Sequence, residues 1–455
     1  MKEEVIAIYD IGKTNKKLIL FDMDLNQLSE EEVIFDEIRD DDGFECDDIE
    51  KIELWVRQSC SDLAKSDKYD LRAVNFTTYG ATLVYLDAHG RRLAPLYNYL
   101  KPVDQEIPEY LYNRYGGKDE FSRQTASPAL GMLNSGLQVL WLKIQKPDIY
   151  SKVRHILHFP QYLSYLLTGQ VMSEHTSIGC HTAMWDFDKM QYHKWLADEG
   201  VVLPEPVPVD TMSETVISGK KVLVGTGLHD SSASLAPYFN TGTDKFLVVS
   251  TGTWCINMNP FNEETLTSEE LSRDCLCYLS ITKKPVKSSR LFIGHMHDAA
   301  VKIMSEYFKI HENSFRLVKP DTKLLNKMMT KYESEAIFFD TSSMMPALIK
   351  DPELFIFDNF IEGYHKLMIE LSDLVVHSVE LVIAEKDDTE VIYLTGGFSK
   401  NPLFVRLFAS SFPDKKVFTS EISNATALGA ASVTINSMSP EHPINPEIGL
   451  FEVKY

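Results

Sequence analysis

The residues of this chain that are best suited to phosphate chemistry lie in a lysine-rich turn near its start. Residues 10–17 read Asp-Ile-Gly-Lys-Thr-Asn-Lys-Lys and, together with Ala7, fit a loose Walker A pattern in which alanine replaces the first glycine. A Walker A loop lies between a strand and a helix, and the N–H groups at the start of that helix hold the phosphate. Here apolar runs at residues 5–9 and 18–21 flank the turn, and no amphipathic period of a helix follows it. The sequence therefore predicts a β-hairpin at this place instead of a Walker A loop.

A hairpin turn of this composition can still bind phosphate. Gly12 permits unusual backbone angles, and exposed N–H groups would form an anion nest among the lysines. The alternative is a solvated hairpin tip whose lysines serve solubility. The residues of the turn beside such a nest are Gly12, Lys13, Thr14, Asn15, Lys16 and Lys17.

The chain contains the same kind of turn a second time. Residues 246–250 form an apolar run, Thr251, Gly252 and Thr253 follow, and residues 254–258 alternate as a returning strand. In both turns a polar residue at the strand end precedes a glycine and then a threonine. Two such hairpins, spaced by about half the chain, indicate duplicated domains that face a shared ligand.

Two further strand ends carry residues that could act on a ligand. Asp230 comes after the predicted strand 221–225, at the start of a small-residue helix, where its carboxylate could act as a general base or only cap the helix. Gly396 and Gly397 lie between a strand at residues 390–394 and a helix at residues 402–411. They could let a base or ribose approach the backbone, or they could form an ordinary turn.

His295 and His297 form a His-x-His pattern. On a strand this pair would place both imidazoles on one face, which suits a divalent metal ion. A metal site needs three or four ligands, and the spacing offers no third one. We therefore favour packing, or a place along the substrate cleft, for both histidines.

The elements that must position these residues alternate between strands and helices. A helical middle section extends to about residue 196, and a small-residue helix at 425–431 suits close packing at a hinge. No flexible linker is evident, so we expect two α/β domains, residues 1–240 and 241–455, that touch along a cleft. Further helices are predicted at residues 47–64, 137–142 (ended by Pro147), 161–167 (ended at Gly169) and 364–384, and further strands at 72–77 and 81–86.

Composition excludes several classes of partner. The chain has 455 residues, more than one ordinary core, and a formal charge of −21, which argues against nucleic acid or an anionic membrane as a partner. Its six cysteines form no Cys-x-x-Cys pair, which favours reduced thiols over a disulfide scaffold. The acidic start does not resemble a signal peptide, and no apolar run is long enough to cross a bilayer. We therefore expect a cytoplasmic protein.

Six motifs in order along nearly the whole chain resemble the FGGY family of carbohydrate kinases. The helical middle section is similar to that family's helical region, and the His229-Asp230 pair and the turn ending in Trp254 most resemble its rhamnulokinase and fuculokinase branch. The six motifs are residues 10–17, 77–80, 227–230, 250–254, 395–397 and 427–430.

The resemblance implies a fold, a reaction and a role for each motif. The fold would be two ribonuclease H-like domains of the sugar kinase, actin and chaperone ATPase superfamily, flanking a cleft for nucleotide and sugar. Asp230 would be the general base that activates a sugar hydroxyl for attack on ATP, and Asp10 would hold Mg²⁺, in part through water. The first turn and Gly252 with Thr253 would contact phosphates, Gly396 and Gly397 would contact adenosine, and the substrate contacts would be Gly80, His229, Asp230 and Ser231.

The chain also departs from the family's pattern, which leaves the sugar open. Residues 97–102 read Tyr-Asn-Tyr-Leu-Lys-Pro where many members have a Trp-x-Asp-x-Arg-like stretch, residues 291–296 lack an asparagine typical of the branch, and Lys13 and Asn15 replace hydroxyl residues. The expected reaction is ATP-dependent phosphorylation of the primary hydroxyl of a ketose such as L-rhamnulose or L-fuculose. Alternatives are a kinase for xylulose, ribulose or a polyol, an actin-like or chaperone-like ATPase, and a sugar-binding regulator. A homodimer is compatible with the sequence.

Overall fold

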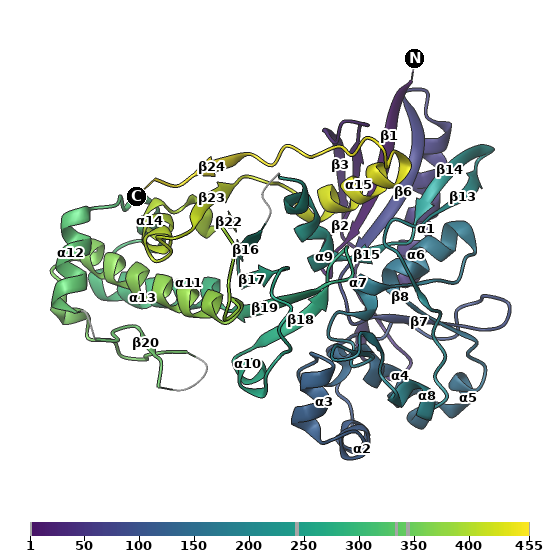
Figure 1. Cartoon of the computed structure of the whole chain (residues 1–455), viewed down its shortest axis with the longest axis horizontal. Coiled ribbons are helices and arrows are strands. Elements are labelled where there is room, and N and C mark those ends of the chain that lie inside the picture. The colour runs from purple at the N-terminus through teal and green to yellow at the C-terminus, as the bar shows by residue number, and fades with distance from the viewer. Residues whose placement is uncertain (1, 242–244, 333–334, 343–345, 455) are drawn as a thin grey trace.

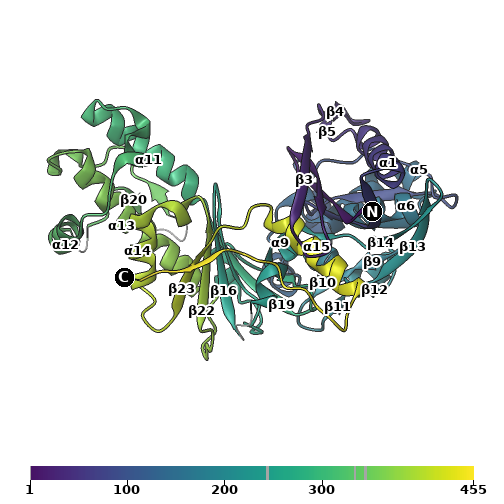
Figure 2. The same cartoon turned by 90° about the horizontal axis from the view of Figure 1, so that it is seen from above.

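The computed structural model describes residues 2–241, 245–332, 335–342 and 346–454. These residues form two lobes that lie side by side, each built on a mixed β-sheet with helices packed against it (Figures 1 and 2). The predicted two-domain α/β class is therefore confirmed.

The sheet of the first lobe contains the predicted hairpin. Its strands are β1 (Glu3–Ile11), β2 (Lys16–Phe21), β3 (Gln27–Val33), β6 (Tyr69–Thr78), β13 (Met212–Ile217), β14 (Lys220–Gly225) and β15 (Leu228–His229). The order is β13-β14-β6-β1-β2-β3, and β15 pairs with the end of β6. β1 and β2 pair antiparallel, and β6 runs parallel to β1. The turn between β1 and β2 is thus a hairpin turn and not the start of a helix.

Alternating side chains of β1 fill two different cores. The odd-numbered residues 5–11 pack with α1 (Ile49–Lys65) and α6 (Phe159–Thr168). Ile6 and Ile8 point to the opposite face and pack in the core that contains α9 (Asp230–Leu235) and α15 (Ala425–Met438). Both faces are apolar because helices cover both, which explains the nearly continuous apolar run of this strand.

Helix α15 comes from the far end of the chain and packs on the first sheet (Figure 2). The approach to α9 is so close that a Cβ at Gly429 would lie 1.8 Å from the carbonyl oxygen of Ala233. Lys17 Nζ on β2 donates to Asn424 Oδ1, just before the helix, over 3.0 Å. The chain then returns to the second lobe as β24 (Leu450–Glu452) (Figure 1). The predicted close packing of this helix is confirmed, while the domain limit at residue 240 stays a prediction.

The middle section of the first lobe is helical, as predicted. It has its own apolar core around Tyr97, Trp141 and Trp195. Helix α4 (Ser135–Gln145) ends before Pro147, which is itself the first residue of α5 (Pro147–Tyr150). Gly169 ends α6 in the left-handed conformation with a φ of 68°, which glycine adopts without steric cost. The helices are α2 (Glu106–Arg114), α3 (Lys118–Gln124), α4 (Ser135–Gln145), α5 (Pro147–Tyr150), α7 (His175–Ile178) and α8 (Trp195–Asp198).

The second lobe repeats the hairpin. Its strands are β16 (Phe246–Thr251), β17 (Cys255–Asn259), β18 (Cys275–Leu279), β19 (Pro285–Leu291), β22 (Val391–Gly396), β23 (Lys416–Ser420) and β24. β16 and β17 pair antiparallel, β22 runs parallel to β16, and the order is β18-β19-β17-β16-β22-β23-β24. The second predicted hairpin is confirmed. The helices are α10 (Ser268–Ser272), α11 (Ile293–Phe308), α12 (Thr322–Lys331), α13 (Phe360–Glu380) and α14 (Pro402–Ser410).

Short strands complete the two lobes. They are β4 (Ile38–Arg39), β5 (Glu45–Cys46), β7 (Leu83–Leu86), β8 (His155–His158), β9 (Ser173–Glu174), β10 (Trp185–Asp186), β11 (Gln191–Tyr192), β12 (Pro206–Val207), β20 (Phe339–Asp340) and β21 (Ala347–Leu348). All six cysteines are buried free thiols. Among the described residues, no helix combines the length and the apolar character that crossing a membrane requires.

His295 and His297 lie in α11 and not on a strand, which was the condition under which this pair would suit a metal ion. Two residues along a helix turn the side chain by about 200°, so the imidazoles point in different directions. His295 is exposed and stacks on Phe292, whereas His297 is buried with Nε2 3.3 Å from the hydroxyl of Tyr364. The structure therefore removes the geometric argument for a metal site at this pair.

Candidate active site

Asp10 and Asp230 lie near each other at the carboxyl end of β6. The register pairs Asp10 of β1 with Thr77 of β6, and it pairs His229 of β15, directly before Asp230, with Thr78 of β6. Strand β6 therefore has Asp10 on one side and the chain that leads into Asp230 on the other. Two carboxylates that are far apart in the sequence meet at one edge of the sheet, where ligands commonly bind in α/β proteins.

The electrostatics of Asp10 fit a cation site. Burial, and after it the negative charge of Asp230, raise the pKa of Asp10 to about 7, against a lowering by Lys17. A carboxylate whose charge is disfavoured by burial and by a neighbouring carboxylate is stabilised by a divalent cation placed near it. Oxygen donors of this kind suit Mg²⁺, which takes one or two carboxylates and keeps several waters. The residues present thus fit the predicted metal.

Asp230 is the first residue of α9, and its side chain is 37 % exposed. The residue that caps the helix is His229, whose Nδ1 accepts from the N–H of Ser231 over 3.2 Å. Asp230 Oδ1 accepts from the same N–H over 2.6 Å and from the hydroxyl of Ser231 over 3.3 Å. His229, and not Asp230, is therefore the cap of this helix. The partly exposed carboxylate of Asp230 is held in place by Ser231.

The first turn is tight, and acidic side chains hold its lysines. The N–H of Gly12 donates to the carbonyl oxygen of Asn15 over 2.9 Å, while Thr14 is exposed at the tip. Lys13 pairs with Glu37 and Asp47 at 2.7 and 2.6 Å. Gly12, Lys13, Thr14 and Asn15 thus form one tight turn, in which Lys13 is shared by two carboxylates.

Lys16 and Lys17 face opposite sides of β2. Lys17 Nζ is 2.7 Å from Glu30 Oε1 and remains partly exposed. Lys16 is only 1 % exposed, and its Nζ binds Asp47 Oδ1 at 2.9 Å. The predicted phosphate contact of the Lys16 side chain is therefore corrected: a strand alternates its side chains, and residue 16 points into the protein.

The second turn and the turn at residues 395–399 are in direct contact. The carbonyl oxygen of Thr251 accepts from the N–H of Gly397 over 2.6 Å, and its hydroxyl accepts from the N–H of Phe398 over 3.1 Å. The N–H of Gly252 donates to the carbonyl oxygen of Trp254 over 2.8 Å, and Thr253 is exposed. The parallel pairing of β16 and β22 thus assembles Gly252, Thr253, Gly396 and Gly397 at one edge of the second sheet.

The residues predicted to contact the substrate also meet. A Cβ at Gly80 would lie 2.7 Å from His229 Nε2, so Gly80 borders the imidazole directly. His229 is followed by Asp230 and Ser231 in the start of α9. Burial lowers the pKa of His229, while the charge of Asp230 acts to raise it.

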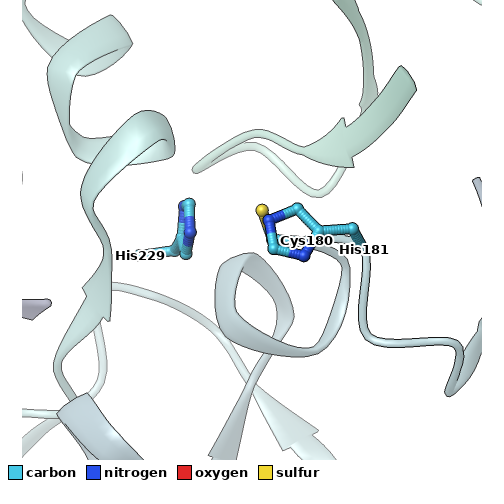
Figure 3. Close-up of side chains that lie close together, drawn as sticks. All are labelled: Cys180, His181 and His229. Atoms are coloured by element: carbon cyan, nitrogen blue, oxygen red, sulfur yellow. The ribbon is translucent and has the colours of Figure 1, made fainter. Parts of the chain in front are cut away.

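Two further residues beside His229 were not identified from the sequence. Cys180 and His181 follow helix α7 and lie against His229 (Figure 3). Burial, and then His229, lower the pKa of His181 to about 4, so this imidazole is neutral. From the second lobe, Tyr278 in β18 lies close enough that Cys180 and Asp230, after burial, raise its pKa. Their distance along the chain from His229 gives no local pattern that sequence reasoning could use.

The chain is similar to known carbohydrate kinases in sequence. Residues 5–225 match the N-terminal domain of the FGGY family of carbohydrate kinases, and residues 243–330 match an FGGY carbohydrate kinase C-terminal domain. A rhamnulokinase of Yersinia pestis is 27 % identical over 270 residues, which are 55 % of this chain and 53 % of that protein. The chain thus spans about half the length of the first relatives it matches. A rhamnulokinase of Oceanobacillus iheyensis is 21 % identical over 454 residues, which cover 92 % of this chain and 90 % of that protein.

Solved structures of the same fold are also known. The crystal structure of a carbohydrate kinase from Novosphingobium aromaticivorans has a TM-score of 0.82 and 22 % identity, and the match covers 100 % of this chain and 95 % of that one. At this identity the likeness bears on the fold. It confirms the predicted two-domain architecture over the whole chain.

Proposed function

Because the chain belongs to the FGGY family of carbohydrate kinases, we propose that it transfers the γ-phosphoryl group of ATP to a hydroxyl group of a small sugar. The observation that carries this proposal is the meeting of Asp10 and Asp230 at the end of β6, where His229 precedes Asp230 and borders Gly80. A cation-binding carboxylate next to a partly exposed carboxylate is the pair that phosphoryl transfer to an alcohol requires.

In the proposed reaction Asp230 is the general base. It accepts the proton of the sugar hydroxyl as the oxygen attacks the γ-phosphorus, and the β–γ bridging oxygen leaves with ADP. Ser231 supports this role because its N–H and hydroxyl both hold Asp230 Oδ1, which leaves Oδ2 for the substrate. Asp10 would hold Mg²⁺, which when bound neutralises charge on the phosphate oxygens.

The glycine turns would hold the nucleotide. The first turn, with Gly12 to Asn15 and Lys17, and the second turn, with Gly252 and Thr253, offer backbone N–H groups and cations to the phosphates. Gly396 and Gly397 would lie against the adenosine. Of Lys16 only the backbone is retained in this proposal, because Asp47 occupies its ammonium group.

For the acceptor we propose the primary hydroxyl of a ketose such as L-rhamnulose or L-fuculose. The support is the similarity to proteins named rhamnulokinase, at 21–27 % identity. In the region where the family's Trp-x-Asp-x-Arg-like stretch is replaced, Lys101 is buried between Asp40 and Asp42. Tyr99 belongs to the same stretch, and burial is the main cause that raises its pKa. The charge of Asp230 is one of the further causes that raise it.

A coupled assay of ADP release tests the proposal. The purified chain is supplied with ATP, Mg²⁺ and, in turn, L-rhamnulose, L-fuculose, L- and D-xylulose, L- and D-ribulose and glycerol. We expect ADP release to depend on one of the ketoses, and on L-rhamnulose or L-fuculose above the others. Equal ADP release with and without every sugar would instead favour the alternative of an ATPase without a small-molecule acceptor.

Asp230→Asn tests the catalytic base in the same assay. We expect kcat to fall by about 10²–10⁴-fold, because general base catalysis contributes that much, while the Kd of ATP stays within a few-fold. Asp358→Asn is the matched control, since Asp358 is an exposed carboxylate at the surface of the second lobe. An Asp230→Asn variant with undiminished turnover on the preferred sugar would refute the role of this residue.

A further inference from the structure

Cys180, His181 and His229 form a cluster of metal-ligating side chains beside Asp230. Their ligand atoms all lie within 4.8 Å of one another, and Cys180 and His229 are buried. Figure 3 shows His229 on one side and Cys180 with His181 on the other. Chelation of a cation requires this kind of convergence from separate segments.

Two members of the cluster, Cys180 and His181, have a ligand atom to spare. His181 Nδ1 lies 3.3 Å from the carbonyl oxygen of Leu133, which can only accept, so Nδ1 carries the proton and Nε2 keeps its lone pair. The Cys180 thiol makes no hydrogen bond with the described residues. A protonated Nδ1 that is tied to a backbone carbonyl is the arrangement that metal-binding histidines usually have.

His229 can adopt the same arrangement. Its Nδ1 is 3.2 Å from the N–H of Ser231 and 3.3 Å from Asp230 Oδ1. In the structure Nδ1 accepts from that N–H, so a metal ion would require the other tautomer, in which His229 gives up this hydrogen bond, donates from Nδ1 to Asp230 and presents the lone pair of Nε2 to the cluster. The N–H of Ser231 then keeps Asp230 Oδ1 as its acceptor over 2.6 Å. Carboxylate, histidine and metal would then form a chain in which the carboxylate orients the ligand.

The backbone around the cluster keeps the space open. A Cβ at Gly80 would lie 2.7 Å from His229 Nε2 and 3.7 Å from His181 Cε1, so glycine leaves room between the two rings. His181 itself has a φ of 39°, in the left-handed region that a histidine adopts at an energetic cost. The strained loop presents Cys180 and His181 to the same side.

We propose that Cys180, His181 and His229 bind a thiophilic divalent cation such as Zn²⁺, and that the bound cation excludes the acceptor sugar. One thiolate and two imidazoles are ligands that Zn²⁺ takes in tetrahedral sites, with the fourth position left to water. Bond lengths of about 2.0–2.3 Å imply ligand atoms about 3.5 Å apart. Side-chain rotations that move the ligand atoms by about 1 Å would therefore close the site. On binding, the thiol proton passes to solvent and a sulfur–metal bond forms. Mg²⁺ prefers oxygen ligands and would not compete here.

The second half of this inference rests on the proposed function, since it places the cation among the residues proposed to contact the sugar. Gly80 and His229 are predicted sugar contacts, and a metal–histidine bond would remove the imidazole from the sugar. The same bond would engage Asp230 as the partner of His229 Nδ1. A cation at this place would therefore raise the apparent KM of the sugar and leave the affinity for ATP unchanged.

Cobalt titration tests the binding half without any kinase activity. Apo-protein is titrated with Co²⁺, which replaces Zn²⁺ in such sites and gives a sulfur-to-cobalt absorption band in the near ultraviolet when a thiolate binds. We expect this band to saturate at a single Co²⁺ per chain and to disappear on addition of Zn²⁺. Cys180→Ser should abolish the band, and Cys275→Ser, which changes a buried thiol in the core of the second lobe, should retain it.

Two results would overturn the binding half. The first is the absence of the band in the wild-type protein, and the second is a band of equal strength in Cys180→Ser. His181→Asn provides a second variant if Cys180→Ser does not fold by circular dichroism, and it should weaken Co²⁺ binding by about tenfold or more, the loss that corresponds to about 1.4 kcal/mol.

Inhibition kinetics test the second half and separate it from the proposed function. With the preferred sugar, Zn²⁺ should raise the KM of the sugar in the wild type, and EDTA followed by Mg²⁺ should reverse the effect. Zn²⁺ that lowers kcat without changing this KM would refute exclusion of the sugar. A chain that binds Co²⁺ yet phosphorylates no sugar would contradict the proposed function and leave the metal site standing.

Discussion

The carbonyl oxygen of Thr251 accepts a hydrogen bond from the backbone N–H of Gly397 over 2.6 Å. This bond joins the second hairpin turn to the turn after β22, two segments that lie about 145 residues apart in the chain. The residues of the two turns therefore form one continuous surface. It also explains the glycine before it. A Cβ at Gly396 would lie 1.7 Å from the same carbonyl oxygen, and Gly396 has a φ of 87°.

Gly396→Ala should therefore destabilise the second lobe. Backbone strain alone costs about 1–3 kcal/mol, and the contact with Thr251 forces the two turns apart. We expect the midpoint of urea denaturation to fall and the KM of ATP to rise, because the surface proposed for adenosine is disrupted. Both quantities are measured on the same preparation.

Gly252→Ala is the contrasting variant. The nearest atom to a Cβ there is the carbonyl oxygen of Trp254 at 3.7 Å, an ordinary van der Waals contact. Stability should stay within about 0.5 kcal/mol of the wild type, as for substitutions away from packed features, while binding of ATP should weaken because the methyl group projects where phosphate is proposed. Unchanged binding of ATP would argue against a phosphate contact at this turn.

The buried pair of Lys16 and Asp47 should be a large contributor to stability. Lys16 is 1 % and Asp47 6 % exposed, and Asp47 also accepts from Lys13 and from the hydroxyl of Tyr79. Asp47→Asn leaves a buried ammonium group without its counter-charge, which costs about 3–5 kcal/mol. We expect this loss in urea denaturation. Glu263→Gln, which breaks the exposed pair with Lys284, should cost at most about 1 kcal/mol, and equal effects of the two variants would contradict the argument.

Local patterns were enough to predict the frame of the site. Apolar runs on both sides of residues 10–17 and 251–253 predicted both hairpins, because a turn between two short apolar runs leaves no room for a helix. The position of Asp230 after a strand predicted its place at the start of α9. These features are determined by residues that are adjacent in the chain, so they can be predicted from the sequence.

Features that depend on distant partners were not predictable in the same way. Lys16 reads as a phosphate ligand beside two other lysines, but the pleat of β2 turns it toward Asp47. On a strand His295 and His297 would suit a metal ion, but both lie near the start of a helix that packs in the core of the second lobe. Cys180 and His181 meet His229 only through the fold. In each case the partner that decides the role of the residue lies 30 or more residues away in the chain. Lys16 meets Asp47, His297 meets Tyr364, and His181 meets His229.

Asp10→Asn should change the dependence of the reaction on Mg²⁺. The variant keeps the shape of the side chain and removes the charge that would hold the cation, so the Mg²⁺ concentration for half-maximal activity should rise by about tenfold or more, equivalent to about 1.4 kcal/mol. A magnesium titration at saturating ATP and sugar measures it. Asp67→Asn, at an exposed carboxylate, is the control. A titration curve identical to that of the wild type would count against a role of Asp10 in holding the metal.

Glu174 should make stability depend on pH. This carboxyl group caps α7 by accepting from the N–H groups of Thr176 and Ser177, and burial, which outweighs these hydrogen bonds, raises its pKa from 4.5 to about 7. The folded state then binds the proton more tightly than the unfolded state, so the contribution of Glu174 to stability is fully present below about pH 4.5 and is lost as the pH rises to about 7.

Glu174→Gln keeps an acceptor oxygen and carries no titrating proton. The free energy of unfolding of the variant relative to the wild type should therefore increase between these pH values, by up to about 3 kcal/mol at about 1.4 kcal/mol per pKa unit. Urea denaturation at several pH values measures this difference, with Glu306→Gln on the exposed face of α11 as the control; a difference that is constant with pH, or that decreases, would mean that Glu174 is ionised in the folded protein throughout.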